Sequence, residues 1–179
     1  MEEDIERILL TKEQILSKVR EIGAQISEDY AGEEPVFVGV LKGCFIFMAD
    51  LMRTVEVNCS MDFMAVSSYQ GTNSTGAVKI IKDLSGIIEN KHIILVEDIL
   101  DSGITLNYLK NYLSVRHPAS IRIVTLLDKP ARRKADIVAD YSCFEVPDEF
   151  VVGYGLDYNE KYRNLPYIGI LSPEVYGGK

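Results

Sequence analysis

The sequence predicts an α/β fold, with a largely parallel sheet flanked by helices and a small irregular subdomain beside it. Unbroken apolar runs at residues 36–41, 92–100 and 121–130 are typical of strands buried on both faces, and segments with helical spacing alternate with them. From about residue 140 onward, short strand-like runs are interrupted by many turn residues. Ligands of such parallel sheets bind beyond the carboxyl ends of the strands, so we expect the functional residues there.

The first expected element is an amphipathic helix. Thr11 and Gln14 have the spacing of a capping box, which predicts that the helix begins here, and its pattern continues to Gly32. The apolar face recurs at helical spacing and contains Ile15, Val19, Ile22 and Ile26.

A strand, turn and helix unit follows. Pro35 precedes the apolar run at 36–41, and a Lys-Gly turn then leads to a second helix at about 45–53.

A hairpin-like loop is expected next. Residues 61–69 and 77–84 alternate as strands do, and the stretch QGTNSTG at 70–76 separates them. Because this stretch is rich in Gly, Ser, Thr and Asn, we expect a mobile loop. After the strand at 92–100, a further helix is indicated by apolar residues at helical spacing, namely Leu106, Leu109, Tyr112 and Leu113.

Composition excludes several classes of protein. The chain has 179 residues, enough for one domain but not for a second catalytic domain. Its 19 basic and 27 acidic residues give a net charge of −8, which argues against a duplex nucleic-acid binder. Three cysteines without a C-x-x-C pair predict reduced thiols rather than disulfides or a zinc site. With no signal-peptide pattern and no apolar run of about 18 residues, we expect a soluble, cytoplasmic protein with no membrane partner.

The most informative motif is VEDILDSGIT, at residues 96–105. It places Glu97 and Asp98 at a strand end and Asp101 beside a small-residue turn that opens a helix. Helix amides and nearby hydroxyls bind phosphate, while the two adjacent acids suit a pair of hydroxyls or a magnesium ion. The motif therefore describes a cradle for a ribose 5-phosphate, whose phosphate-binding turn consists of Asp101, Ser102, Gly103, Ile104 and Thr105. The alternative is that Asp101 and Ser102 only cap the helix and the other acids are solvated.

VEDILDSGIT resembles the phosphoribosyl pyrophosphate signature of the type I phosphoribosyltransferases. Further stretches resemble the hypoxanthine-guanine branch of that family and occur in family order: LKG (41–43), SSYQGTNSTG (67–76), DKPARR (128–133) and PDEFVVGYGLDYNEKYRNLP (147–166). The resemblance implies the type I phosphoribosyltransferase fold in a single domain, residues 1–179. Its hood would be formed by the N-terminal segment and part of about 140–179.

The resemblance also implies a reaction and its participants. The enzyme would transfer the 5-phosphoribosyl group from phosphoribosyl pyrophosphate to hypoxanthine or guanine, giving IMP or GMP, with Mg²⁺ as cofactor. The resemblance further implies a homodimer or homotetramer. Two alternatives are a relative that acts on another base, such as xanthine or adenine, and a regulator that senses phosphoribosyl pyrophosphate and binds nucleic acid. A synthetase of phosphoribosyl pyrophosphate needs two domains and is excluded by length.

The pyrophosphate contacts follow from the same resemblance. Leu41, Lys42 and Gly43 correspond to a loop whose Leu-Lys peptide bond is cis and whose backbone contacts pyrophosphate. Arg163 corresponds to a second pyrophosphate contact.

The purine contacts lie farther along the chain. Lys129 corresponds to the residue that donates to the exocyclic oxygen of the base, and an ammonium group favours a carbonyl there over adenine's amino group. Phe150 corresponds to the aromatic ring that stacks on the purine, and the Val151 backbone to the group that contacts the base edge. Asp157, in the same purine-binding segment, corresponds to a magnesium ligand.

The expected chemistry assigns the remaining residues. Asp101 accepts the proton from N7 of the purine, which makes N9 a better nucleophile, while Glu97 and Asp98 bind the metal and favour a cationic sugar. Ser68 and Tyr69 correspond to a lid loop that excludes water from the reacting centre.

One basic cluster has no assigned role. Arg132, Arg133 and Lys134 are consecutive, and we expect them on a solvated helix face or at a subunit contact.

Overall fold

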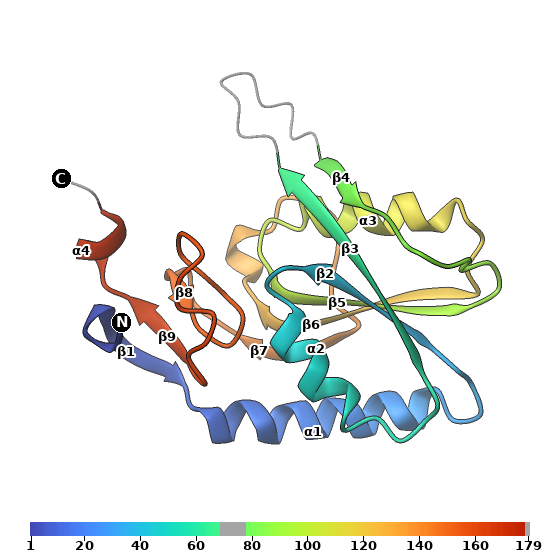
Figure 1. Cartoon of the computed structure of the whole chain (residues 1–179), viewed down its shortest axis with the longest axis horizontal. Coiled ribbons are helices and arrows are strands. Elements are labelled where there is room, and N and C mark those ends of the chain that lie inside the picture. The colour runs from blue at the N-terminus through green and yellow to red at the C-terminus, as the bar shows by residue number, and fades with distance from the viewer. Residues whose placement is uncertain (69–77, 178–179) are drawn as a thin grey trace.

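Two sheets organise the computed structural model, which describes residues 1–68 and 78–177 (Figure 1). In the described residues, a six-stranded sheet has the order β4-β3-β2-β5-β6-β7 and a three-stranded sheet the order β1-β9-β8. The strands are β1 (Ile5–Leu10), β2 (Val36–Leu41), β3 (Ser60–Ser68), β4 (Val78–Lys82), β5 (His92–Leu100), β6 (Ser120–Asp128), β7 (Tyr141–Glu145), β8 (Val151–Val152) and β9 (Ile168–Leu171). The helices are η1 (Glu2–Asp4), α1 (Lys12–Asp29), α2 (Phe45–Met52), α3 (Ile104–Ser114), η2 (Pro130–Arg132) and α4 (Pro173–Tyr176).

The central sheet confirms the predicted α/β class. Strands β3, β2, β5, β6 and β7 pair in parallel, and β4 joins β3 at the edge in an antiparallel pair. Helices α1 and α2 cover one face and α3 covers the other (Figure 1). A hydrophobic core lies on each face of the sheet, and alternate residues of β5 point into the two cores. Ile94 and Val96 pack toward α1 and α2, whereas Ile93 and Leu95 pack toward α3. Burial of both faces explains why these strands read as unbroken apolar runs.

Local signals placed several element boundaries correctly. Thr11 accepts from the Gln14 amide at 3.3 Å, and the Gln14 side chain accepts from the Thr11 amide at 2.8 Å, so the capping box is present. β5 has the predicted bounds. Helix α1 ends at Asp29, before Gly32, whose φ of +84° takes the chain out of the helical region.

The second sheet contains an element that sequence patterning missed. Strand β1 pairs antiparallel with β9, with Ile5 opposite Leu171, and β9 pairs with β8. The sequence IERILL lacks a strict two-residue alternation, so its pattern does not predict a strand. This sheet and α4 stand beside the central sheet, with both ends of the described chain nearby (Figure 1).

Three other expectations concern individual segments. Cys44 and Cys143 are buried, Cys59 is half-buried, and all three are free thiols, as predicted. The expected mobile loop and Tyr69 lie outside the described residues; Ser68 ends β3. Among the described helices, none combines the length and the apolar character needed to cross a bilayer.

Candidate active site

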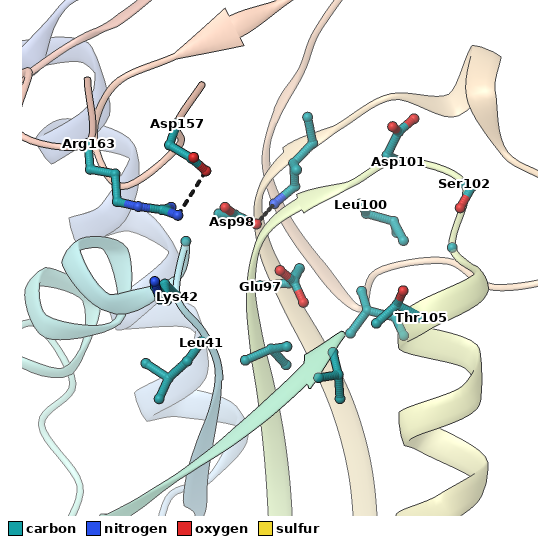
Figure 2. A pocket seen from close by; sticks show the side chains of 16 residues that line it. Leu41, Lys42, Glu97, Asp98, Leu100, Asp101, Ser102, Thr105, Asp157 and Arg163 are labelled. Carbon is teal, nitrogen blue, oxygen red and sulfur yellow. Dashed lines mark hydrogen bonds and ion pairs between the residues drawn. The ribbon is translucent and has the colours of Figure 1, made fainter. Parts of the chain in front are cut away.

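A cavity of about 290 Å³ lies where β2 and β5 end and α3 begins (Figure 2). We call it the phosphate cavity. It brings together most of the predicted ribose and pyrophosphate residues from three separate parts of the chain, 41–43, 97–105 and 157–163. They are Leu41, Lys42, Gly43, Glu97, Asp98, Asp101, Ser102, Gly103, Thr105, Asp157 and Arg163.

The phosphate loop, residues 101–105, forms one wall of this cavity. Gly103 is the N-cap of α3 and has a φ of +77°, a conformation that glycine adopts without strain. A Cβ at this position would lie 2.5 Å from Cγ2 of Ile137, so the packing also requires glycine. No side chain caps α3, and only a long 3.4 Å contact joins the Ile104 amide to the Ser102 hydroxyl. The alternative that Asp101 serves as a helix cap is therefore not supported.

Two adjacent acids lie at the base of the cavity. Glu97 and Asp98 are both half-buried, and Asp98 accepts from the Ile99 amide at 2.8 Å. Burial, together with the neighbouring Asp98 charge, raises the pKa of Glu97 well above its usual range. The Asp98 carboxylate also lies close to Gly43 in the loop after β2. A Cβ added to Gly43 would be only 1.6 Å from Asp98 Oδ2. Any larger residue at position 43 would displace the Asp98 carboxylate.

A second cavity of about 410 Å³, the base cavity, adjoins the first. It contains the predicted purine residues Lys129, Phe150 and Val151. Two residues, Ile99 and Asp101, line both cavities. Asp101 thus lies at the junction of the two cavities.

Lys129 is the most deeply buried cation of the base cavity, with a relative exposure of 6%. Its ammonium donates to the Glu149 carbonyl oxygen at 2.5 Å, and Asp148 Oδ1 lies 4.0 Å away. Burial lowers the pKa of Lys129, although the nearby Asp101 and Asp148 charges oppose this effect. The position favours a ligand that offers a hydrogen-bond acceptor.

Phe150 supplies an aromatic surface to the base cavity and is 38% exposed. Its ring stacks on Tyr176 at a centroid distance of 5.0 Å and an angle of 24°, and it meets Tyr158 edge to face. Tyr176 was not predicted from the sequence, because nothing in the pattern relates α4 to Phe150.

The predicted pyrophosphate residues Lys42 and Arg163 form ion pairs on one side of the phosphate cavity, which we call its pyrophosphate side. Lys42 contacts Glu160 at 3.0 Å. Arg163 contacts Asp157 at 2.9 Å (Figure 2). Arg163 also donates to the Gly155 carbonyl at 2.7 Å. The pair with Lys42 lowers the pKa of Glu160. The Leu41–Lys42 peptide bond is cis, as the family resemblance implied.

The basic cluster after β6 differs from expectation. Arg132 is exposed, and its Nε lies 2.8 Å from Asp101 Oδ1. Arg133 instead turns inward, pairing with Asp128 and donating to the carbonyls of Leu100 and Asp101. The predicted helix face is wrong because η2 ends after three residues. Spacing alone gives no signal that distinguishes the two arginines.

The acids of the phosphate cavity are oxygen donors of the kind that magnesium prefers. Glu97, Asp98 and Asp157 all line this cavity. Among the described residues, no group of three or more His, Cys, Asp or Glu side chains is close enough to hold a metal ion unaided.

Comparisons with known proteins agree with this geometry. Residues 7–159 match the family model described as the phosphoribosyl transferase domain. The chain is 56% identical to a hypoxanthine-guanine phosphoribosyltransferase of Bacillus subtilis over 177 residues, which is 98% of each protein.

Solved structures show the same similarity. A hypoxanthine phosphoribosyltransferase of Staphylococcus aureus superposes with a TM-score of 0.96 at 55% identity, covering 99% of this chain and 97% of the other. A hypoxanthine phosphoribosyl transferase of Trypanosoma cruzi superposes with a TM-score of 0.93 at 42% identity, covering 98% and 95%.

Proposed function

The chain belongs to the phosphoribosyl transferase family, and on that premise we propose that it is a purine salvage enzyme acting on hypoxanthine and guanine. It transfers the 5-phosphoribosyl group from phosphoribosyl pyrophosphate to the base, giving IMP or GMP and pyrophosphate. The observation that carries this proposal is the position of Asp101, which lines both the phosphate cavity and the base cavity. The two substrates must react at such a junction.

The base cavity suits a 6-oxopurine. Phe150 offers a ring on which the base stacks, an interaction of about 1 to 3 kcal/mol. The Lys129 ammonium can only donate, so it donates a hydrogen bond to a carbonyl oxygen at position 6 of the base and offers no acceptor to adenine's amino group. The backbone of Val151, in β8, lies at the same cavity and would contact the edge of the base.

The phosphate cavity suits the sugar and its 5-phosphate. The N-terminus of α3 and the amides of the phosphate loop attract the phosphate, and the Ser102 and Thr105 hydroxyls add donors. Glu97 and Asp98 accept hydrogen bonds from the two ribose hydroxyls. Their negative charge also favours the positive charge that develops on the sugar as pyrophosphate leaves.

Asp101 is the proposed general base. Its carboxylate accepts the proton from N7 of the purine, so that electron density at N9 increases as N9 attacks the anomeric carbon. Arg132 holds this carboxylate by an ion pair at 2.8 Å and thereby orients it. The bond between the sugar and pyrophosphate breaks on the opposite side, near Lys42 and Arg163.

A magnesium ion fits the donor set. Mg²⁺ commonly uses one or two carboxylates and completes its coordination with substrate phosphates and water, which agrees with acids that line a cavity without forming a closed cage. Glu97, Asp98 and Asp157 would hold it. When bound, the ion would neutralise the charge of the departing pyrophosphate.

The wider organisation is also proposed. Residues 1–179 form one domain, in which the sheet β1-β9-β8 and its connections serve as the hood of the base cavity. We propose a homodimer or homotetramer; for the Trypanosoma cruzi relative, a published structure concerns the role of the C-terminal region in oligomeric state and enzymatic activity. The three free thiols support a reducing, cytoplasmic location.

Base turnover tests the proposal. The protein is incubated with phosphoribosyl pyrophosphate and either hypoxanthine, guanine, xanthine or adenine, with and without excess chelator, and the nucleotide and pyrophosphate are quantified. We expect hypoxanthine and guanine to be converted only when a divalent metal is present. Preferred conversion of adenine or xanthine would overturn the base assignment, and full activity in chelator would overturn the metal assignment.

A further inference from the structure

The segment at residues 129–135 lies directly behind the phosphate loop. We call it the anchor segment. Its backbone amides donate to two carbonyls of the loop region: Lys129 to Leu100 at 3.0 Å, and Lys134 and Ala135 to Ser102 at 2.9 and 3.1 Å. Because Lys129 also lines the base cavity, hydrogen bonds of the anchor segment connect that cavity directly to the phosphate loop.

Arg133 completes this set of contacts with its side chain. Its Nη1 donates to the carbonyl oxygens of Leu100 at 3.0 Å and Asp101 at 2.6 Å, and its Nη2 pairs with the Asp128 carboxylate. The side chain is only 17% exposed, and its Cδ would lie 3.1 Å from a Cβ on Gly103. Three successive carbonyls, those of residues 100–102, are thus fixed toward the anchor segment.

This arrangement determines where the amides of the loop point. In a trans peptide the N–H group is directed opposite to the carbonyl of the preceding residue, and the only cis bond within the described residues is Leu41–Lys42. Fixing the carbonyls of Asp101 and Ser102 therefore turns the amides of Ser102 and Gly103 away from the anchor segment, toward the cavity that both residues line. Within residues 1–68 and 78–177, neither amide donates to another protein group.

Charge attraction does not explain the role of Arg133. Its guanidinium is paired with the half-buried Asp128 carboxylate, so the pair adds no net charge near the phosphate. Arg133 is also absent from the residues that line either cavity. Any effect of Arg133 on a ligand must therefore pass through the loop backbone.

We propose that Arg133 is a positioning residue that aims the phosphate-loop amides at the 5-phosphate of the nucleotide. This inference rests on the proposed function, because it names the ligand group that the loop receives. Through the Asp101 carbonyl, the same contacts fix the backbone of the proposed general base. Preorganised amides bind phosphate without first reorienting, and misplacement of a binding group by about 1 Å can cost on the order of 100-fold.

The test measures how much the 5′-phosphate contributes to binding. Dissociation constants of inosine and IMP are determined for the wild type, Arg133→Met and Arg133→Lys, and the inosine-to-IMP ratio is compared. Methionine keeps the aliphatic stem but donates nothing, and lysine has a single donor group in place of the fork. We expect the ratio to fall about 10- to 100-fold in Arg133→Met and less in Arg133→Lys, with inosine binding nearly unchanged.

Arg116→Met provides the matched control. Arg116 also forms a half-buried pair with an aspartate, Asp83, but it follows α3 at the helix end remote from the phosphate loop. Its replacement should lower stability without changing the ratio. A merely structural Arg133 would likewise leave the ratio unchanged, or would weaken inosine and IMP equally, and either result overturns the proposal.

Two further outcomes remain decisive. If Arg133→Met does not fold, the ratio in Arg133→Lys decides, and a wild-type ratio there refutes the positioning role. Wild-type turnover of hypoxanthine is measured in the same experiment. Its absence would refute the proposed function, whereas normal turnover with an unchanged ratio in the variants would refute only the inference about Arg133.

Discussion

The two sides of the phosphate cavity are held in different ways. On the phosphate side, backbone hydrogen bonds from the anchor segment and the Arg133–Asp128 pair, whose side chains are 17% and 19% exposed, hold the loop. On the pyrophosphate side, the Lys42–Glu160 pair is 67% and 63% exposed, and Arg163 is held partly by Asp157. One side presents amides that donate to no other protein group within residues 1–68 and 78–177, and the other presents cations that already have carboxylate partners.

We call the phosphate side rigid, because contacts within the protein hold its backbone. We call the pyrophosphate side exchangeable, because its cations can exchange a carboxylate partner for a ligand. An exposed ion pair contributes about 0 to 1 kcal/mol, so a pyrophosphate can displace Glu160 from Lys42 at little cost. The loop backbone, held by hydrogen bonds to the anchor segment, cannot be rearranged as cheaply, because each broken bond leaves an unsatisfied polar group. We therefore expect binding of the leaving group to depend on salt more strongly than recognition of the 5-phosphate.

The largest expected effect tests whether the rigid side also carries the chemistry. Asp101→Asn keeps the size of the side chain but removes the carboxylate, so turnover should fall on the order of 10² to 10⁴-fold while phosphoribosyl pyrophosphate still binds. Steady-state kinetics and a binding isotherm separate the two quantities, and a melting curve checks the fold. A folded variant within a few-fold of wild-type kcat would exclude Asp101 as the base.

The next effect concerns the base cavity, which adjoins the phosphate cavity at Ile99 and Asp101. Lys129→Gln exchanges a charged donor for an amide with both a donor and an acceptor. The kcat/KM for hypoxanthine should fall about 10- to 100-fold, the equivalent of one charged hydrogen bond, and discrimination against adenine should narrow.

The pH dependence of the same variant adds a second readout. Burial lowers the pKa of Lys129 below the ordinary value of 10.5. The ammonium therefore loses its proton at a lower pH than an exposed lysine does, and the deprotonated amine is a weaker hydrogen-bond donor. The difference in KM between wild type and Lys129→Gln should therefore shrink as the pH rises into this range. A constant difference up to pH 10.5 would contradict the assignment.

A smaller effect is expected from Gly103→Ala on the rigid side. Alanine at a φ of +77° is strained, and its Cβ would lie 2.5 Å from Ile137 Cγ2, so unfolding should become about 1 to 2 kcal/mol easier. Chemical denaturation measures this change. Gly32→Ala is the matched control, since its φ of +84° imposes the same strain but no atom lies within 4 Å of the new Cβ. Equal losses in both variants would show that packing at the phosphate loop contributes nothing.

The smallest effect is expected on the exchangeable side. Glu160→Gln removes the carboxylate that competes for Lys42, so pyrophosphate should bind up to about fivefold more tightly at low salt. The gain should disappear at high ionic strength. Weaker binding in the variant would mean that Glu160 assists the ligand instead of competing with it, and the comparison between the two sides would fail.

The sequence revealed those parts of the fold whose physical cause is local. Residues 93–96 of β5 are buried and apolar at every position, as expected of a strand covered on both faces, and this local pattern is why β5 was placed with its observed bounds. Strand β1 was missed because its partner, β9, lies at the other end of the chain, and the sequence IERILL has no clear alternation. Pairing over such a separation leaves no short-range pattern.

The candidate site shows the same limit. The motif at residues 96–105 indicated a phosphate cradle because its acids, small residues and helix start are contiguous. Arg133 and Glu160 were missed, since a charged residue in a polar stretch reads as solvated whichever way it turns. Their directions are set by the short η2 turn and by the fold that brings Glu160 to Lys42.

The pairing of β1 with β9 also constrains how the chain assembles during synthesis. All strands of the central sheet lie within residues 36–145, whereas β1 and β8 both need β9, at residues 168–171. At about 5 to 20 residues per second, β1 waits roughly 10 to 30 seconds for its partner. The nascent central sheet can therefore close while the apolar side chains of β1 are still uncovered and available to chaperones. A chain released before residue 168 would keep the whole central sheet but leave both β1 and β8 as unpaired edges, which favours aggregation.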